Sequence, residues 1–197
     1  MRLLLATRNP HKLREFERLL PSVTLDPLPD ELESPREDGD TYAANALIKA
    51  RAAAQATGRA AIADDSGIEA AALGGAPGVR TARFAGEHAT DEENLAKLGR
   101  EAPAGTALRY VCVIAHVDPD GSEHLFEGTT SGAVAPEPRG SGGFGYDPLF
   151  VPDDGGGDGR TMAELPDAEK DSISHRGRAA RALQRWLARA PEESPAR

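Results

Sequence analysis

Two adjacent carboxylates and a hydroxyl, Asp64, Asp65 and Ser66, follow a short apolar run at residues 60–63. The run predicts the end of a buried strand, and Gly67 would let the backbone turn sharply just after it. Charges buried beside a strand need a partner, and Mg²⁺ is a partner that prefers hard oxygen ligands. From these residues alone, a metal site and a solvated Asx turn both remain open.

A second stretch with chemical potential is the glycine-rich segment 140–148, which carries Phe144 and Tyr146. Glycine allows a close approach of the backbone, and aromatic rings can stack on a flat ligand. The pattern indicates a binding loop, with a surface loop that carries incidental aromatics as the alternative.

The junction at residues 7–12 follows an apolar strand at 3–6 and opens a helix. The spacing of Leu13, Phe16 and Leu20 predicts that helix, and Asn9 is a suitable N-cap. A helix N-terminus presents free N–H groups and a positive dipole end, so the junction could hold a phosphate. The glycines of a P-loop are missing, and an ordinary capped helix is the alternative.

The remaining patterns predict an α/β fold with a mixed sheet. Strands alternate with helices in the first half, and a hairpin with a clear turn signal lies in the middle. The elements expected after the first helix are strand 23–28, helix 41–57, apolar segment 70–73, a helix from the capping box at 90–93 through 98, strands 108–117 and 124–130, and a helix opened by Ser174.

Composition excludes several classes of protein. The 197 residues are 39% hydrophobic and 28% charged, and no apolar run is long enough to span a bilayer. The net charge of −9 argues against general binding to nucleic acids or anionic membranes, so an anionic substrate needs a local basic site or a metal. Cys112 is the only cysteine, which rules out an internal disulfide and suits the cytoplasm.

Four motifs, in this order, resemble the inosine triphosphate pyrophosphatase family, also known as Ham1-like or RdgB-like non-canonical purine NTP pyrophosphatases. The motifs are Thr-Arg-Asn-Pro-His-Lys at 7–12, Ala-Asp-Asp-Ser-Gly at 63–67, Gly-Gly-Phe-Gly-Tyr-Asp-Pro at 142–148 and Ser-His-Arg-Gly at 174–177. A further match covers residues 73–78, and the resemblance runs from about residue 3 to 187.

The resemblance implies hydrolysis of ITP, dITP, XTP and dXTP to the monophosphate and pyrophosphate, with Mg²⁺ as cofactor, by a homodimer. It implies an elongated α/β fold in which helices flank a long mixed twisted sheet and two lobes surround a central cleft. We expect residues 1–190 to form this single domain and residues 191–197 to form a frayed tail.

The resemblance also implies roles for individual residues. Asp65 matches the catalytic carboxylate, a proton acceptor and metal ligand, and Glu37 resembles a second metal ligand. Residues 7–12 resemble the phosphate-binding loop, and Lys49 resembles a second phosphate contact. The substrate-binding positions implied in this way are Thr7, Arg8, Asn9, Pro10, His11, Lys12, Lys49, Ser66, Phe144, Gly145, Tyr146, Asp147, Lys170, His175 and Arg176.

Two positions depart from the family pattern: Arg8 stands where glycine is common, and Ala44 stands where bacterial members often have glutamate.

The chemistry of the side chains also predicts a base pocket. Arg176 and His175 can donate to the 6-oxo group of hypoxanthine or xanthine, whereas the 6-amino group of adenine would leave a buried donor unpaired.

Parts of the sequence are also compatible with three other functions. A serine hydrolase would use Ser66 with His175 and an aspartate, but Ser66 lacks the Gly-x-Ser-x-Gly elbow. A non-catalytic nucleotide-binding protein would bind ITP without turnover. A related pyrophosphatase would act on other modified nucleotides.

Overall fold

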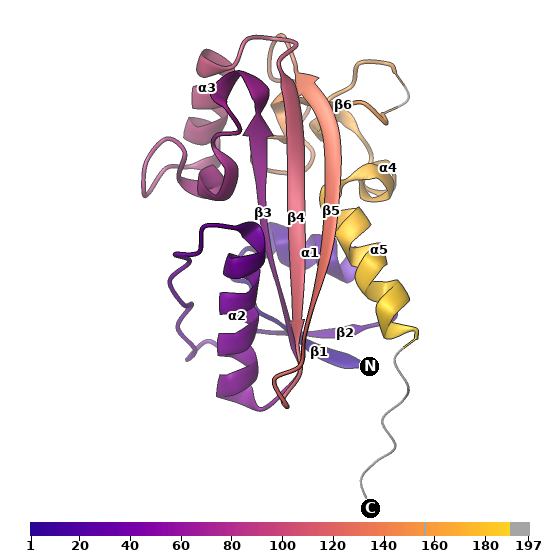
Figure 1. Cartoon of the computed structure of the whole chain (residues 1–197). Helices are drawn as coiled ribbons and strands as arrows, with labels where there is room; N and C mark the ends of the chain where they lie inside the picture. Colours follow the sequence, from indigo (N-terminus) through magenta and orange to yellow (C-terminus); the bar gives the residue numbers. More distant parts are fainter. Residues whose placement is uncertain (156, 190–197) are drawn as a thin grey trace, which may run out of the picture.

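The computed structural model describes residues 1–155 and 157–189, which fold around one six-stranded mixed sheet. Its strand order is β2-β1-β3-β4-β5-β6; β1 is parallel to β2 and β3, and the later pairs are antiparallel. Three long strands, β3 to β5, run through the length of the molecule (Figure 1). The strands are β1 (Arg2–Leu5), β2 (Thr24–Pro27), β3 (Ala61–Ala70), β4 (Ala107–Val117), β5 (Glu123–Val134) and β6 (Phe150–Pro152).

The helices begin where the sequence places capping side chains. Asn9, Thr41 and Ser174 each accept a hydrogen bond from a first-turn N–H, and Thr90 forms a capping box with Glu93. The helices are α1 (Pro10–Leu19), α2 (Tyr42–Thr57), α3 (Asp91–Glu101), α4 (Asp167–Ile173) and α5 (His175–Leu187), with short 3₁₀ helices η1 (Ala71–Leu73), η2 (Gly78–Arg83), η3 (Asp147–Leu149) and η4 (Met162–Glu164).

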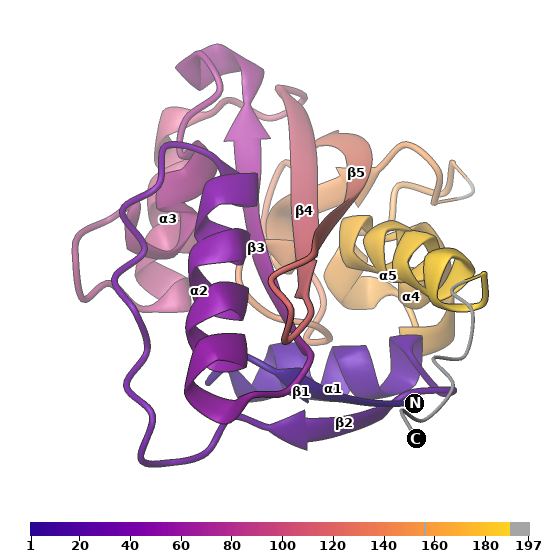
Figure 2. The same cartoon turned by 60° about the horizontal axis from the view of Figure 1, so that its bottom comes forward.

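Helices cover both faces of one half of the sheet. Alanines of α2 pack against Leu4, Ala63 and Ala115, which point to one face. Residues of α1 and α5 pack against Ile62 and Ile114, which point to the other. Helices α2 and α5 accordingly lie to either side of the β4–β5 hairpin in both views (Figures 1 and 2).

A third apolar cluster fills the other half of the molecule, where Ile68 and Tyr110 of the sheet meet Leu98, Tyr146 and Phe150. The middle of β3 therefore lies between this cluster and the two clusters described above. That position places residues 64–67 where the α1, α2 and α5 half meets the α3 half.

The sequence prediction for this stretch was wrong in one respect: the strand does not end at Ala63. Every residue from Ala61 to Ala70 is paired with β4, so the two carboxylates lie inside a continuous strand. Gly67 is needed for close packing, because a Cβ there would lie 2.5 Å from the carbonyl oxygen of Gly78. In the apolar segment 70–73, Ala70 ends β3 and the next three residues form η1.

Most other element predictions are confirmed with small shifts in their bounds. Strand β5 continues to Val134 and α3 to Glu101, a few residues beyond the predicted ends. Within the described residues, no helix is long and apolar enough to cross a membrane. The predicted frayed tail at 191–197 lies outside the part of the chain that the structure describes.

Candidate active site

A cavity of about 370 Å³ lies where β3, α1, α2 and the glycine-rich loop meet. Residues from all four motifs line it, although they are far apart in the sequence. Of the predicted site residues, Pro10 and His11 are not part of the lining, which includes Thr7, Arg8, Asn9, Lys12, Glu37, Lys49, Asp65, Ser66, Phe144, Gly145, Tyr146, Asp147, Lys170, His175 and Arg176.

The adjacent carboxylates of β3 point to opposite faces of the sheet, because side chains alternate along a strand. Asp64 faces α1 and α5, where its Oδ2 lies 2.9 Å from Lys12 Nζ and 3.4 Å from Arg176 Nη2. Asp65 faces α2, where Asn45 Nδ2 donates to its Oδ2 at 3.1 Å. The two aspartates therefore do not form one ligand cluster, in contrast to the interpretation of this stretch as a shared metal site.

The two environments shift the pKa values of the aspartates in opposite directions. Burial alone would raise the pKa of Asp64, but the charges of Lys12 and Arg176 outweigh it and hold that pKa below its usual range. Burial raises the pKa of Asp65, and Lys49 and Lys12 offset the effect only in part. Asp65 is thus the carboxylate whose negative charge is less well compensated.

Glu37 and Asp65, the two predicted metal ligands, lie around one ammonium group. Lys49 Nζ is 2.8 Å from Glu37 Oε2 and 3.8 Å from Asp65 Oδ1. This pair of hard oxygen donors fits Mg²⁺, which one or two carboxylates usually hold together with phosphate and water. Among the described residues, no three acidic, histidine or cysteine side chains form a metal-binding group.

Sequence reasoning missed Glu15, which is buried at the centre of an ionic network. It accepts hydrogen bonds from Lys170 Nζ at 2.8 Å and from Arg176 Nη1, and Lys170 also donates to Asp147 Oδ2 at 2.7 Å. Burial alone would raise its pKa, but Arg176 and Lys170 lower it to about 2. One signal in the sequence could have indicated this position. Glu15 follows Lys12 by one helical turn, so the two share a helix face, and it adjoins the apolar Phe16.

The two residues that open α5 are buried next to this network. Arg176 Nη2 donates to Ser66 Oγ at 2.9 Å, and Ser66 Oγ donates to Asp64 at 3.1 Å. The His175 ring stacks on Tyr110 with centroids 4.4 Å apart, and burial lowers its pKa well below the usual value. Within the described chain, Arg176 Nε and His175 Nδ1 are buried without a hydrogen-bond partner.

Two predicted site residues also donate hydrogen bonds to backbone carbonyls. Arg8 donates to the carbonyl oxygens of Pro29 at 2.7 Å and Leu32 at 2.6 Å, so it anchors the acidic segment beside the cavity. Tyr146 is buried in the third apolar cluster, and its hydroxyl donates to the Thr81 carbonyl at 2.8 Å. Phe144, which is only partly buried, is therefore the ring with an exposed surface for stacking.

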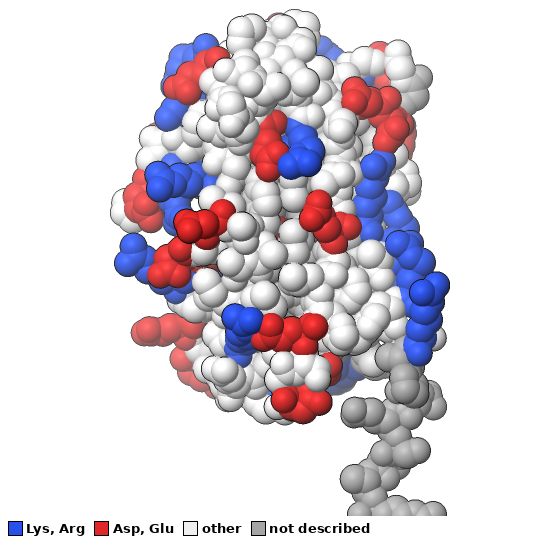
Figure 3. All heavy atoms as spheres, in the orientation of Figure 1, with Lys and Arg blue, Asp and Glu red and all other residues white. Residues whose placement is uncertain are grey.

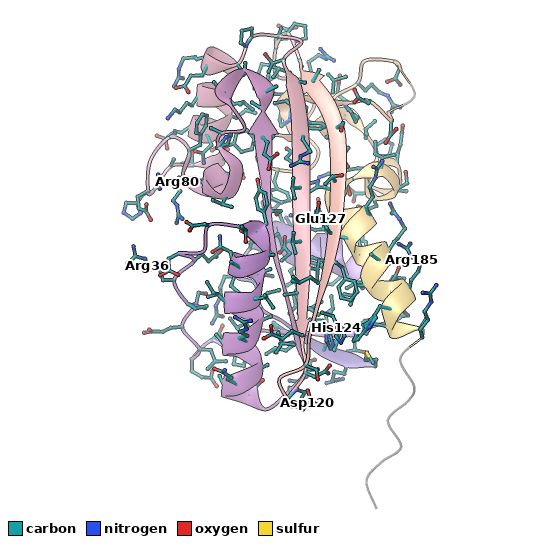
Figure 4. The ribbon with its side chains drawn as sticks, in the orientation of Figure 1. Arg36, Arg80, Asp120, His124, Glu127 and Arg185 are labelled. Carbon is teal, nitrogen blue, oxygen red and sulfur yellow. The ribbon has the colours of Figure 1, made fainter. Side chains whose placement is uncertain are left out.

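Other arginines near this region do not belong to the site. Arg36 precedes Glu37 in the sequence, and Arg80 lies in η2, but both point outward from the same side of the molecule (Figure 4). Neither lines the cavity. The basic side chains that line the cavity are Arg8, Lys12, Lys49, Lys170 and Arg176.

Comparisons with known proteins agree with these motifs. Residues 3–186 match the model of the Ham1 family. The chain is 46% identical to a dITP/XTP pyrophosphatase of Corynebacterium diphtheriae, over 93% of this chain and 95% of the relative. It is 50% identical to a protein of the same name from Symbiobacterium thermophilum, over 93% and 94%. A HAM1 protein from Coxiella burnetii matches in structure, with a TM-score of 0.85, 39% identity and coverage of 96% and 100%.

The ionic network predicts a pH dependence of stability at Glu15. Its folded pKa is about 2 and its ordinary value is 4.5, so its ionised form stabilises the fold above pH 4.5. This contribution is lost as the pH falls toward 2. The free energy of unfolding in urea should therefore be lower for Glu15→Gln than for wild type at pH 7, and the gap should narrow between pH 4.5 and 2.

The exposed neighbour Glu17 on the same helix supplies a control. Glu17→Gln should leave the free energy of unfolding nearly unchanged at every pH. A gap for Glu15→Gln that stays constant over this range would show that the network does not hold the carboxylate in its ionised form.

Proposed function

The chain belongs to the Ham1 family and hydrolyses non-canonical purine nucleoside triphosphates, and we propose that the cavity beside β3 is where this reaction takes place. The observation that carries the proposal is the collection of Lys12, Lys49 and Lys170 around one cavity in a chain of net charge −9. A polyanionic substrate is repelled by the whole chain, so it needs such a local group of cations.

The charges on the surface outside the cavity support this contrast between a net negative chain and a local group of cations. On the face shown in Figure 3, acidic and basic side chains are mixed, and Lys and Arg gather mainly along α5. Two arginines of this helix have other partners, since Arg178 pairs with Asp154 and Arg181 donates to the carbonyls of Asp171 and Ser172. We propose that the triphosphate meets its compensating charges inside the cavity, where Lys12, Lys49 and Lys170 lie.

We place the phosphates beside the N-terminus of α1, between Lys12 and Lys49. Both ammonium groups are paired with carboxylates in this structure, Lys12 with Asp64 and Lys49 with Glu37. Each ammonium group has three N–H donors, so each lysine can bind a phosphate oxygen while it keeps its carboxylate partner. The base then lies toward Phe144, on the side of the glycine-rich loop.

Asp65 is proposed as the proton acceptor. Water attacks the α-phosphorus, the bond from that phosphorus to the bridging oxygen of the β-phosphate breaks, and pyrophosphate leaves while the water proton passes to Asp65. Asn45 holds one oxygen of this carboxylate, which fixes its orientation. A base with a raised pKa is a better proton acceptor at neutral pH than a fully compensated carboxylate such as Asp64.

We further propose that Glu37 and Asp65 hold Mg²⁺ together with phosphate oxygens. When bound, the ion would neutralise developing charge and lower the pKa of the attacking water. Homodimerisation is proposed on the family resemblance, and a cytoplasmic location on the presence of a single cysteine. The net charge of −9 supports the proposal that neither nucleic acid nor a membrane is a partner.

Replacement of Asp65 tests its catalytic role. Asp65→Asn keeps the shape of the side chain and the strand but cannot accept the proton, so kcat for ITP should fall at least about a hundredfold. The exposed Asp38 supplies the control, and Asp38→Asn should retain wild-type kcat. Pyrophosphate release measures both variants, and a near-wild-type kcat for Asp65→Asn would exclude the role.

Base selection is proposed to depend on Arg176, whose buried guanidinium donates but cannot accept. ITP and XTP should be hydrolysed much faster than ATP and GTP. Arg176→Ala should lower kcat/KM for ITP and narrow its advantage over ATP, because the penalty against a 6-amino group disappears with the donor. Arg176→Lys, which keeps a cation for Glu15, should retain part of the advantage.

The measurement is kcat/KM for the four triphosphates in wild type and both variants. An equal loss for ITP and ATP in Arg176→Ala would show that Arg176 does not select the base. Binding of ITP without pyrophosphate release by the wild type would instead identify a nucleotide-binding protein, and hydrolysis of a different modified nucleotide would identify the related pyrophosphatase.

A further inference from the structure

The backbone around Phe144 does little to fix its ring. Gly143 and Gly145 flank it with φ angles of 67° and 63°, a region that glycine adopts freely. The loop is tied by backbone contacts, since Phe144 N donates to Asp147 Oδ2 at 3.0 Å and Gly145 N donates to Asp91 Oδ2 at 3.1 Å. These bonds anchor the main chain but leave the side-chain torsions of Phe144 to be set by ring contacts.

One ring contact comes from the first turn of α1. The rings of His11 and Phe144 are stacked, with centroids 5.2 Å apart and an interplanar angle of 25°. Arg14 Nη2 lies 2.9 Å from His11 Nδ1, so the next turn of the same helix holds the imidazole. This chain of contacts links a helix, which is rigid, to a ring on a glycine-rich loop.

The location of His11 separates it from the substrate-binding residues. Phe144 lines the cavity, whereas His11 does not, and both His11 and Arg14 are exposed. The family resemblance places His11 in the phosphate-binding loop, but its ring contacts Phe144 of the glycine-rich loop. Within the described residues, the one aromatic contact of the exposed His11 ring is thus with a ring that lines the cavity.

We propose that His11 is a positioning residue, which holds the Phe144 ring in the orientation on which a purine base stacks. The proposal rests on the function proposed above. Pairs of stacked aromatic rings contribute enough to change binding by about two- to tenfold. Stacking tolerates any base, so His11 contributes to the affinity for purines in general and does not discriminate among them.

The test measures ligands that contain a base and a ligand that contains only phosphates. We expect His11→Ala to weaken calorimetric binding of inosine monophosphate about two- to tenfold and to leave binding of inorganic tripolyphosphate unchanged. KM for ITP should rise by a similar factor with kcat nearly constant. His11→Phe should restore binding, and the exposed His88 provides a control, since His88→Ala should change neither ligand.

A double-mutant cycle shows whether the effect passes through Phe144. In the Phe144→Ala background, His11→Ala should cause no further loss. An equal loss in both backgrounds, weaker binding of tripolyphosphate, failure of His11→Phe to restore binding, or unchanged binding in His11→Ala would each overturn the proposal. Calorimetry does not require turnover. A wild type that binds but does not hydrolyse ITP would therefore count against the proposed function and not against the positioning role of His11.

Discussion

The alternation of side chains along β3 is the constraint on which the site depends. Because Asp64 and Asp65 are neighbours in a fully paired strand, they point to opposite faces of the sheet. One meets cations from α1 and α5, and the other meets an amide and a more distant lysine from α2. Two identical residues thereby acquire different chemistry, one as a fixed counter-ion and the other as a candidate base.

The fixed counter-ion is part of a network that joins separate elements. Asp64 on β3 and Glu15 on α1 share Arg176 of α5, and Glu15 also holds Lys170 of α4. Removing one member of such a buried network leaves its partners uncompensated, which costs more than the net contribution of the pair. The same network lies beside Phe144, whose ring centroid is 5.5 Å from both Lys170 Nζ and Arg176 Cζ. The packing of the helices and the base end of the cavity therefore depend on the same charges.

Local signals in the sequence predicted the helix caps and the β4–β5 hairpin, and the family resemblance identified the motifs that meet at the cavity. The course of β3 could not be predicted locally, because two acids followed by serine and glycine have the composition of a turn. Gly67 is explained by its long-range contact with η2, and Glu15 by partners more than 150 residues away. The motifs predicted that Tyr146 and Arg8 belong to the site. They could not predict that both side chains donate to backbone carbonyls, because those contacts depend on tertiary structure.

The most direct test of this account is a carboxyl ¹³C NMR titration of Asp64 and Asp65 in the intact protein, with assignments from the two single Asn variants. We expect Asp65 to protonate at a higher pH than an ordinary aspartate, whereas Asp64 should stay ionised below that range. Titration of both carboxylates at the same pH, or of Asp64 before Asp65 as the pH falls, would contradict the assignment of separate environments to the two faces of β3.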